Sequence, residues 1–294
     1  MNKIVAIVVT YNRKELLKMC IGNLLNQTIS SDIIVVDNAS TDGTKELFDN
    51  NNEFIRYFNT GSNLGGAGGF YYGIKKAVEL GYDYLWILDD DTMPTPMALE
   101  TFVNTDKELN GKYGFLTSKV LWKDDSICTM NIQKITKWKK LKNFDYVHSV
   151  QYASFVSLFI KASIVRRIGL PYREFFIWAD DWEYTRRISK KEKCYFVPGS
   201  VVHHWSNTNV GANIITTEPD RMERFNYMYR NDVVMYRQDG IEGSVYLFIR
   251  NILHKIRIYK DGKNVKEKLT LIERATKEGK LFYPKVEFPE GEKF

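Results

Sequence analysis

Three consecutive carboxylates, Asp89, Asp90 and Asp91, follow the apolar run Trp86–Leu88 and precede Thr92–Pro94. A short apolar run bounded by polar residues and a proline predicts a buried strand, so the acids lie at its C-terminal end, where open α/β sheets bind ligands. Because strand side chains alternate between faces, Asp89 and Asp91 share one side. Two hard oxygen ligands suit Mg²⁺ or Mn²⁺ bound to phosphate oxygens. An acidic turn that closes the strand is the simpler alternative.

A second acidic pair, Asp180 and Asp181, follows an aromatic stretch and begins a predicted helix. Helix N-termini favour carboxylates by roughly 0.3–1 kcal/mol, so capping accounts for one of these acids but not for both. The predicted strand Tyr195–Trp205 then ends in His203 and His204. Most histidines are structural or surface-exposed, but a histidine at a strand end downstream of an acidic pair is a candidate third metal ligand.

These groups must be positioned by strands and helices that alternate along the N-terminal part of the chain. Such alternation predicts a parallel, doubly wound sheet with right-handed crossovers. The predicted elements are the strand Ile4–Val9, the helix Lys14–Asn26, the strand Ile33–Asp37, a turn over 38–44 into a helix through Phe48, the strand Ile55–Phe58, and a helix from the glycine-rich Asn63–Phe70 to about Leu80.

The glycines of Asn63–Phe70 do not match the Rossmann dinucleotide fingerprint, because their spacing differs and they lie between the third and fourth strands. They either let the backbone approach a bulky ligand or permit a tight loop. Beyond Pro94 the regular alternation ends. The lysine-rich stretch Lys123–Asp145 is interpreted as a solvated hairpin or loop, or alternatively as a recognition surface. A long helix is predicted over Pro219–Met235.

The length and composition of the chain limit the classes of protein to which it can belong. With 294 residues, 44% of them apolar, the chain can form one large α/β domain or a domain with an appendage. Cys20, Cys128 and Cys194 lie far apart without metal-ligand spacing, which argues against disulfides and zinc. The apolar start Ile4–Val9 is too short for a signal-peptide core, and no stretch approaches the roughly 18 apolar residues of a spanning helix. We therefore expect a cytoplasmic protein.

The net charge of +6 is concentrated in the C-terminal part. Between Arg250 and Lys280, ten Lys or Arg stand against four Asp or Glu. Such a tail suits an anionic membrane surface or a lipid-linked anionic substrate, whereas a nucleic-acid binder would spread its charge over the folded face. The apolar residues of Tyr246–Leu253 beside Lys255–Lys268 predict a helix on the inner face of the membrane. A helix packed against its own domain is the alternative.

Five segments of the chain form a recognisable series. In sequence order they are Val8–Arg13, Val36–Thr44, Asn63–Phe70, Leu88–Asp91, and the stretch from Phe175 through Asp180 and Asp181 to Arg187. Together they resemble the inverting, metal-dependent family 2 nucleotide-sugar glycosyltransferases with the GT-A fold. The resemblance covers approximately the first 240 residues and implies a Rossmann-like, mostly parallel sheet flanked by helices. It divides the chain into a nucleotide-sugar-binding half (1–94), an acceptor-binding half (95–240) and a basic helical extension (241–294).

Within the family, the glycine-rich loop, the triple aspartate and an Asp-Asp pair in place of Glu-Asp are most similar to bacterial galactofuranosyltransferases and rhamnosyltransferases. This implies transfer of galactofuranose from UDP-galactofuranose, or of rhamnose from dTDP-rhamnose, to a hydroxyl of a lipid-linked or polysaccharide glycan. Mn²⁺ or Mg²⁺ is the implied cofactor. The acceptor, the linkage, single addition or polymerisation, and the oligomeric state, a homo-oligomer included, stay open.

The resemblance also implies roles for individual residues. Spacing from Pro198 favours His204 as a metal ligand, although a one-residue slip in register would select His203. The implied donor-binding residues are Thr10, Asn12, Arg13 and Asp37 for the uridine or thymidine part, Gly65 in the glycine-rich loop, Asp89 and Asp90 beside the ribose or phosphate, and Arg230 at the diphosphate. The implied metal ligands are Asp89, Asp91 and His204.

The chemistry requires these residue types. Cleavage of a sugar–diphosphate bond builds negative charge that a divalent cation and an arginine offset. The acceptor hydroxyl must lose its proton as it attacks from the opposite face, so one carboxylate must stand apart from the metal. Asp181 is the expected base and Asp180 orients the acceptor, with Glu183 a second candidate for that task.

Two other classes use some of these features. A nucleotidyltransferase also binds a metal with strand-end aspartates, but Thr10–Arg13 lacks the glycine- and lysine-rich phosphate loop expected there. A non-catalytic nucleotide-sugar-binding protein would retain the donor segments and lose the second acidic pair. Asp180 and Asp181 are present, which favours an enzyme.

Overall fold

The computed structural model describes residues 3–49 and 52–289. Within these residues the main sheet consists of β1 (Ile4–Thr10), β2 (Asp32–Asp37), β3 (Ile55–Asn59), β4 (Tyr84–Asp89), β5 (Thr92–Pro94), β6 (Phe115–Trp122), β9 (His148–Ser149), β10 (Leu158–Lys161) and β11 (Tyr195–His204). The strand order is β3-β2-β1-β4-β10-β6-β11-β5, with β9 beside β11. A separate hairpin joins β7 (Lys134–Thr136) to β8 (Lys139–Lys140).

The sheet is mostly parallel. β3, β2, β1 and β4 run parallel, as the alternation of strands and helices predicts. β10 is antiparallel to both of its neighbours and β5 is antiparallel to β11, so the second half is mixed. The register pairs Val9 with Asp89, and therefore Thr10 and the three acids leave the sheet at the same edge.

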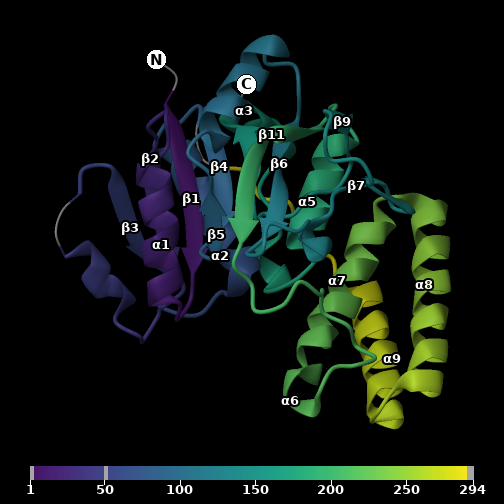
Figure 1. The fold of residues 1–294 in the computed structure, drawn as a ribbon. Helices are drawn as coiled ribbons and strands as arrows, with labels where there is room; N and C mark the ends of the chain where they lie inside the picture. Colours follow the sequence, from purple (N-terminus) through teal and green to yellow (C-terminus); the bar gives the residue numbers. More distant parts are fainter. Residues whose placement is uncertain (1–2, 50–51, 290–294) are drawn as a thin grey trace.

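Helices cover both faces of the sheet (Figure 1). Because strand side chains alternate, Ala6 and Val8 face one core and Ile7 and Val9 the other. The first core contains α1 (Lys14–Leu25) and α3 (Ala98–Glu108); the second contains α2 (Gly65–Glu79), α4 (Ala162–Ile168) and α5 (Asp180–Ser189). Short 3₁₀ turns lie at η1 (Thr44–Phe48), η2 (Thr129–Asn131) and η3 (Arg173–Phe175).

The glycine-rich segment begins α2, and two glycines of this helix let it pack closely on β1. A Cβ added at Gly69 would lie 2.4 Å from Val9 Cγ1, and one at Gly73 would lie 2.5 Å from Ile7 Cγ2. Here the absence of a side chain serves close helix–strand packing.

A helical layer follows the sheet in the chain. The predicted helix over Pro219–Met235 is divided, because α6 (Pro219–Met222) ends before α7 (Arg224–Arg237) begins. α7 packs with α8 (Gly240–Asp261) and α9 (Val265–Leu281) around a common apolar cluster beside the sheet (Figure 1). The chain then returns to the sheet domain, where Leu170 N–H donates to the carbonyl of Glu287 at 2.8 Å. None of the helices among the described residues has the length and apolar character needed to cross a membrane.

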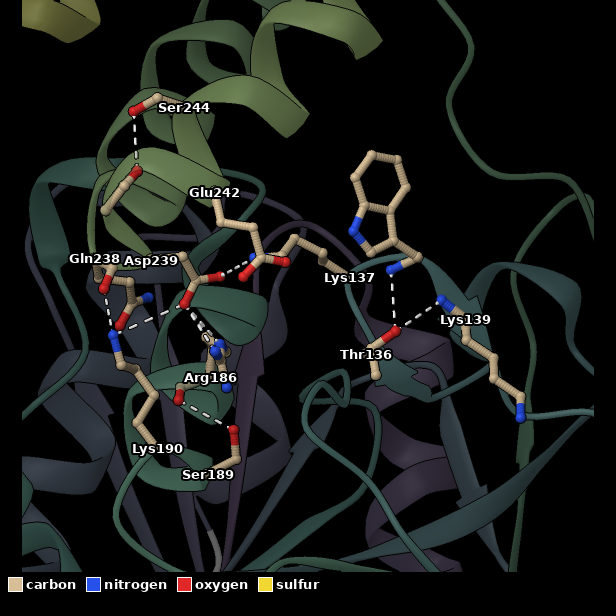
Figure 2. A network of polar contacts seen from close by, with 12 residues as sticks. Thr136, Lys137, Lys139, Arg186, Ser189, Lys190, Gln238, Asp239, Glu242 and Ser244 are labelled. Carbon is tan, nitrogen blue, oxygen red and sulfur yellow. Dashed lines mark hydrogen bonds and ion pairs between the residues drawn. The ribbon is translucent and has the colours of Figure 1, made fainter.

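Asp239, at the corner between α7 and α8, connects three parts of the molecule (Figure 2). Its carboxylate lies 2.7 Å from Arg186 Nη2 on α5 and 3.3 Å from Lys137 Nζ on the loop of the β7–β8 hairpin. Lys137 and Lys134 are buried, so the interpretation of this lysine-rich stretch as solvated is wrong for both. It holds for Lys142, which is exposed.

Candidate active site

A cleft of about 1120 Å³ opens at the edge of the sheet where β1 and β4 end. Both acidic groups line it: Asp89 to Asp91 from the end of β4, and Asp180 and Asp181 from the start of α5. The opposite side is formed by the β7–β8 hairpin, α7 and α8. The cleft therefore brings together carboxylates that are far apart in the sequence.

Asp89, Asp91 and His204 form a group that can hold a metal ion. One ligand atom of each lies within 4.8 Å of the others. Pairing of β11 with β5 places His204 opposite Thr92, so that His204 Nε2 lies 3.1 Å from Asp91 Oδ1. That oxygen is buried, and the imidazole of His204 faces it. Two carboxylates and an imidazole whose ligand atoms converge in a buried site fit a divalent cation.

The structure places the two histidines differently. His203 points away and its Nε2 lies 2.8 Å from Asp125 Oδ1, whereas His204 joins the two aspartates. His204 Nδ1 lies 2.8 Å from Asn131 Oδ1, and donation there leaves Nε2 free to face Asp91. Asn131 belongs to no motif that the sequence analysis identified, and the tertiary fold brings it beside His204.

The charges of this group are strongly coupled. Burial raises the pKa of Asp89 to about 7, with the charge of Asp91 adding to the rise. Burial lowers the pKa of His204, but its hydrogen bond to Asp91 and the charges of both aspartates outweigh this and raise it to about 10. Negative charge is thus crowded into a buried site, and a bound cation would relieve that repulsion. Binding would also require the imidazole to lose its proton.

Asp90 faces Thr10 and Arg13, as strand alternation predicts. It accepts a hydrogen bond from Thr10 Oγ1 at 2.7 Å, and Arg13 Nη1 lies 3.3 Å from Asp90 and 2.6 Å from Asp91. Burial raises the pKa of Asp90 to about 6, although Arg13 opposes the rise. Thr10, Arg13, Asp90 and Gly65 all line the cleft.

Asn12 and Asp37 are not among the residues that line this cleft. Asn12 Oδ1 accepts a hydrogen bond from the N–H of Thr41 at 2.7 Å, and Asp37 Oδ1 accepts one from the N–H of Ser40 at 2.8 Å. Asp37 is fully buried and also accepts the hydroxyl of Tyr57. Both residues shape the loop after β2, and their contact with a nucleoside stays a prediction.

A strained loop delivers the second acidic pair. Phe176, Trp178 and Ala179 have φ angles of 62°, 65° and 66°, which non-glycine residues rarely adopt. Asn231 on α7 holds this loop, since its Nδ2 donates to the carbonyls of Phe175, Ile177 and Trp178 at 2.9, 3.2 and 3.0 Å. Strain of this kind persists where the surrounding structure enforces it and is concentrated at functional sites.

Gly65 supports the same loop from α2. Its φ is +70°, and an added Cβ would lie 2.1 Å from the carbonyl oxygen of Phe176. Asn38 Nδ2 donates to the carbonyl of Gly65 at 3.0 Å. The close approach that this glycine permits is therefore to the protein's own backbone at the cleft.

Asp180 and Asp181 are the first residues of α5, and both line the cleft. Burial raises the pKa of Asp180 to about 6. Burial and the charge of Asp180 raise the pKa of Asp181 well above its usual value, although the N–H of Trp182 donates to it at 2.7 Å. A carboxylate whose pKa is shifted toward neutrality is suited to accept a proton. Glu183 does not line the cleft; it is buried against Arg187, 2.9 Å away.

Arg230 lies outside this cleft. Its Nη2 donates to the carbonyl of Glu174 at 2.7 Å and its guanidinium stacks on Phe282, 4.2 Å from the ring centroid. The structure does not bring Arg230 to the acids, and its contact with a diphosphate stays a prediction. Lys134 and Arg250 line the cleft instead, and no motif in the sequence marked either one.

Comparison with known proteins adds independent information. The family model "Glycosyl transferase family 2" matches residues 5–156. Galactofuranosyltransferase GlfT1 of Mycolicibacterium smegmatis is 25% identical over 252 residues, which cover 80% of this chain and 83% of that protein. Poly(ribitol-phosphate) beta-N-acetylglucosaminyltransferase TarP of Staphylococcus aureus is 27% identical over 210 residues, 67% of this chain and 60% of that protein.

The fold agrees with these matches. The crystal structure of GalNAc-T7 with UDP, GalNAc and Mn²⁺ has a TM-score of 0.64 at 13% identity, covering 94% of this chain and 54% of that one. That likeness supports the GT-A fold. Because the family model spans more than half of the sequence, the chain belongs to glycosyl transferase family 2.

Proposed function

We propose that the chain is a metal-dependent inverting glycosyltransferase that moves a sugar from a nucleoside diphosphate to a hydroxyl of a bacterial cell-surface glycan. The observation that carries this proposal is that one cleft holds two acidic groups of different kinds. Asp89 and Asp91 lie with a histidine, whereas Asp180 and Asp181 lie at the start of α5. Inversion requires this separation, since leaving group and attacking hydroxyl occupy opposite faces of the sugar.

Asp89, Asp91 and His204 would hold Mn²⁺ or Mg²⁺, and the bound ion would offset the charge that develops on the leaving diphosphate. Arg13 lies against the same acids and is half exposed, so it can turn toward a phosphate when a cation takes its place. The N-terminus of α2 at Gly65 also lines the cleft and favours negative charge there. These groups define a donor diphosphate site.

Asp181 would accept the proton of the attacking hydroxyl, and Asp180 would orient the acceptor. Both carboxylates are held by the α5 N-terminus and by the loop that Asn231 fixes, so they are positioned before substrate binds. In this scheme residues 1–94 supply the donor contacts, residues 95–240 the acceptor side, and residues 241–294 an extension that also borders the acceptor side through α8.

We propose UDP-galactofuranose as the donor. The support is the match to galactofuranosyltransferase GlfT1, which covers most of both chains. The UDP and Mn²⁺ bound in the GalNAc-T7 structure accord with a UDP-linked donor in a related fold. The test is a panel of UDP-galactofuranose, dTDP-rhamnose and UDP-glucose, in which release of nucleoside diphosphate is measured with Mn²⁺ and with excess chelator.

UDP release from UDP-galactofuranose that disappears with chelator is the expected result. Faster turnover of dTDP-rhamnose than of UDP-galactofuranose would mean that rhamnose is the transferred sugar, and it would leave the proposed mechanism unchanged. Turnover that is unchanged in chelator, or exchange of pyrophosphate in place of diphosphate release, would overturn the mechanism.

We propose that the enzyme works at the inner face of the membrane and docks through α8. Several large apolar side chains of this helix are exposed and recur every three or four residues, which places them on one face. These residues are Ile241, Val245, Phe248, Ile252, Ile256 and Tyr259. Arg257, Lys260, Lys263 and Lys266 are exposed nearby, so the surface combines apolar and basic groups as interfacial helices do.

A further inference from the structure

Lys134 is a buried lysine without a counter-ion. It is 9% exposed, and its ammonium lies 3.7 Å from the centroid of the Trp182 ring and 5.9 Å from that of Tyr152. Among residues 3–49 and 52–289, this ammonium makes no ion pair or hydrogen bond. A lysine is rarely buried in this way unless something pairs with it, because desolvation of a charge is costly. It lines the cleft, so a bound group can reach it.

The neighbours of Lys134 add positive charge. Arg250 lines the same end of the cleft; it pairs with Asp232, and its Nε is buried without a hydrogen-bond partner among the described residues. Lys140 also lines the cleft, and its charge acts on Lys134. Asp232 is paired with Arg250, and Asp181 is the other acid that acts on Lys134. We call Lys134, Lys140 and Arg250 the cationic end of the cleft.

Burial, followed by the charge of Arg250, lowers the pKa of Lys134 to about 7. The repulsion between these two cations would be relieved by an anion that enters between them. Asp232 and Asp181 are the acids whose charges act most strongly on Lys134. The cationic end is thus associated with the proposed base.

The hairpin that carries Lys134 is fixed in place. The backbone N–H of Lys134 donates to the carbonyl of Tyr152 at 3.0 Å, and Lys137 is paired with Asp239 at the α7–α8 corner (Figure 2). Lys134 is therefore held at the cleft before any ligand binds, which lowers the entropy cost of binding.

We propose that the cationic end binds a phosphate ester of the acceptor, so that the acceptor class is a phosphorylated glycan. The inference rests on the proposed function, because it places the acceptor beside Asp181. The phosphate can belong to a polyol phosphate or to a prenyl diphosphate that carries the glycan. Both would present the same anionic oxygens to Lys134, and lysine and arginine are the side chains that bind phosphate in proteins.

The test uses the full chain saturated with UDP and Mg²⁺, so that the donor site is filled. Ligand-observed NMR measures the affinity of glycerol 3-phosphate against glycerol in one arm, and of farnesyl diphosphate in the other. Lys134→Met keeps the length and apolar contacts of the side chain but removes the charge, Lys134→Arg restores a charge, and Lys142→Met is the matched control on an exposed lysine of the same stretch. Affinity for UDP and the melting temperature report whether each variant is folded.

We expect the phosphate esters to bind and glycerol not to bind. Lys134→Met should weaken this binding by about ten-fold or more, Lys134→Arg should recover most of it, and Lys142→Met should leave it unchanged. Preference for one arm identifies the source of the phosphate. Equal binding of glycerol and glycerol 3-phosphate, or unchanged affinity in a folded Lys134→Met variant, would overturn the inference. Failure of the wild-type chain to bind UDP at all would instead overturn the proposed function.

Discussion

At the scale of single residues, Asp180 and Asp181 both line the cleft at the start of α5 but differ in their surroundings. Asp181 accepts a hydrogen bond from the N–H of Trp182, and the negative charge of Asp180 adds to the effect of burial on its pKa. The pKa of Asp181 is therefore shifted more strongly than that of Asp180. We predict that Asp181→Asn keeps affinity for the donor and lowers kcat by about 10²–10⁴-fold, the usual contribution of a general base. Steady-state kinetics and UDP binding measure the two quantities. If Asp180→Asn is inactive and Asp181→Asn is active, the roles are exchanged.

The acid limb of the pH profile tests the same residue. A proton acceptor must be ionised, and the raised pKa of Asp181 means that its ionised form is lost, as pH falls, at a higher pH than for an ordinary aspartic acid of pKa about 3.9. Activity should therefore be full above this raised pKa and fall as pH decreases through it. We predict that the acid limb of kcat lies well above pH 4 in wild type. A limb at an ordinary carboxyl pKa would contradict an acceptor in this environment.

The two adjacent histidines provide a matched pair of variants. His204 lies with Asp89 and Asp91, while the Nε2 of His203 lies 2.8 Å from Asp125 Oδ1. We predict that His204→Ala weakens Mn²⁺ binding and reduces turnover by at least ten-fold, since each side chain that binds the ion directly contributes to the affinity for it. His203→Ala should behave as wild type in Mn²⁺ titrations of UDP release. Equal effects of the two substitutions would contradict the assignment of His204.

At the scale of elements, α7 controls the geometry of the catalytic loop through Asn231. Its amide donates to three carbonyls of the strained loop, and no other described side chain makes all three bonds. We predict that Asn231→Ala lowers the free energy of unfolding by about 1–3 kcal/mol, because buried acceptors lose their partner. Turnover should fall as well, since Asp180 directly follows the loop.

The control for this prediction is Asn226→Ala on the same helix, whose amide bonds to Glu223 and accepts a hydrogen bond from Arg274 on α9. Urea unfolding gives the stability of both variants and UDP release gives their turnover. Loss of stability in Asn231→Ala without loss of turnover would show that the strained loop is not needed to place Asp180 and Asp181.

At the scale of the whole molecule, the C-terminal helices pack against the rest of the chain on one side and present the proposed membrane surface on the other. Arg250 is ion-paired inside the cleft and Lys268 Nζ donates to the carbonyl of Ile215, so part of the basic charge serves the fold. The alternative of a helix packed on its own domain is thus correct for one face of α8, where Leu247 and Ile258 are buried. The opposite apolar face is exposed and is the proposed membrane surface.

We predict that Phe248→Ser with Ile256→Ser weakens co-sedimentation with anionic vesicles and leaves the melting temperature unchanged, because these side chains are 67% and 56% exposed. Lys260→Gln with Lys263→Gln should weaken binding mainly at low salt, by about 1 kcal/mol for each charge. Point substitutions are preferable to truncation, which would remove Arg250 from the cleft. Vesicle binding that none of these variants alters would contradict docking through α8.

The sequence by itself determined the parts of the protein that depend on local patterns. Apolar runs predicted the strands that became β1, β2 and β4, because hydrophobic periodicity reports burial within a single element. Alternation predicted that Asp89 and Asp91 share a side while Asp90 faces the other, since that rule needs only one strand. The order of the motifs was sufficient to indicate the family.

Tertiary structure decided what depends on contacts between distant segments. The choice of His204 over His203 came from the pairing of β11 with β5, and the partner that orients His204, Asn131, lies 73 residues away in the sequence. Arg230 was expected at the cleft and packs elsewhere, while Lys134 reaches the cleft because its hairpin is fixed to the α7–α8 corner. Such positions follow from the packing of the whole chain, which no local pattern encodes.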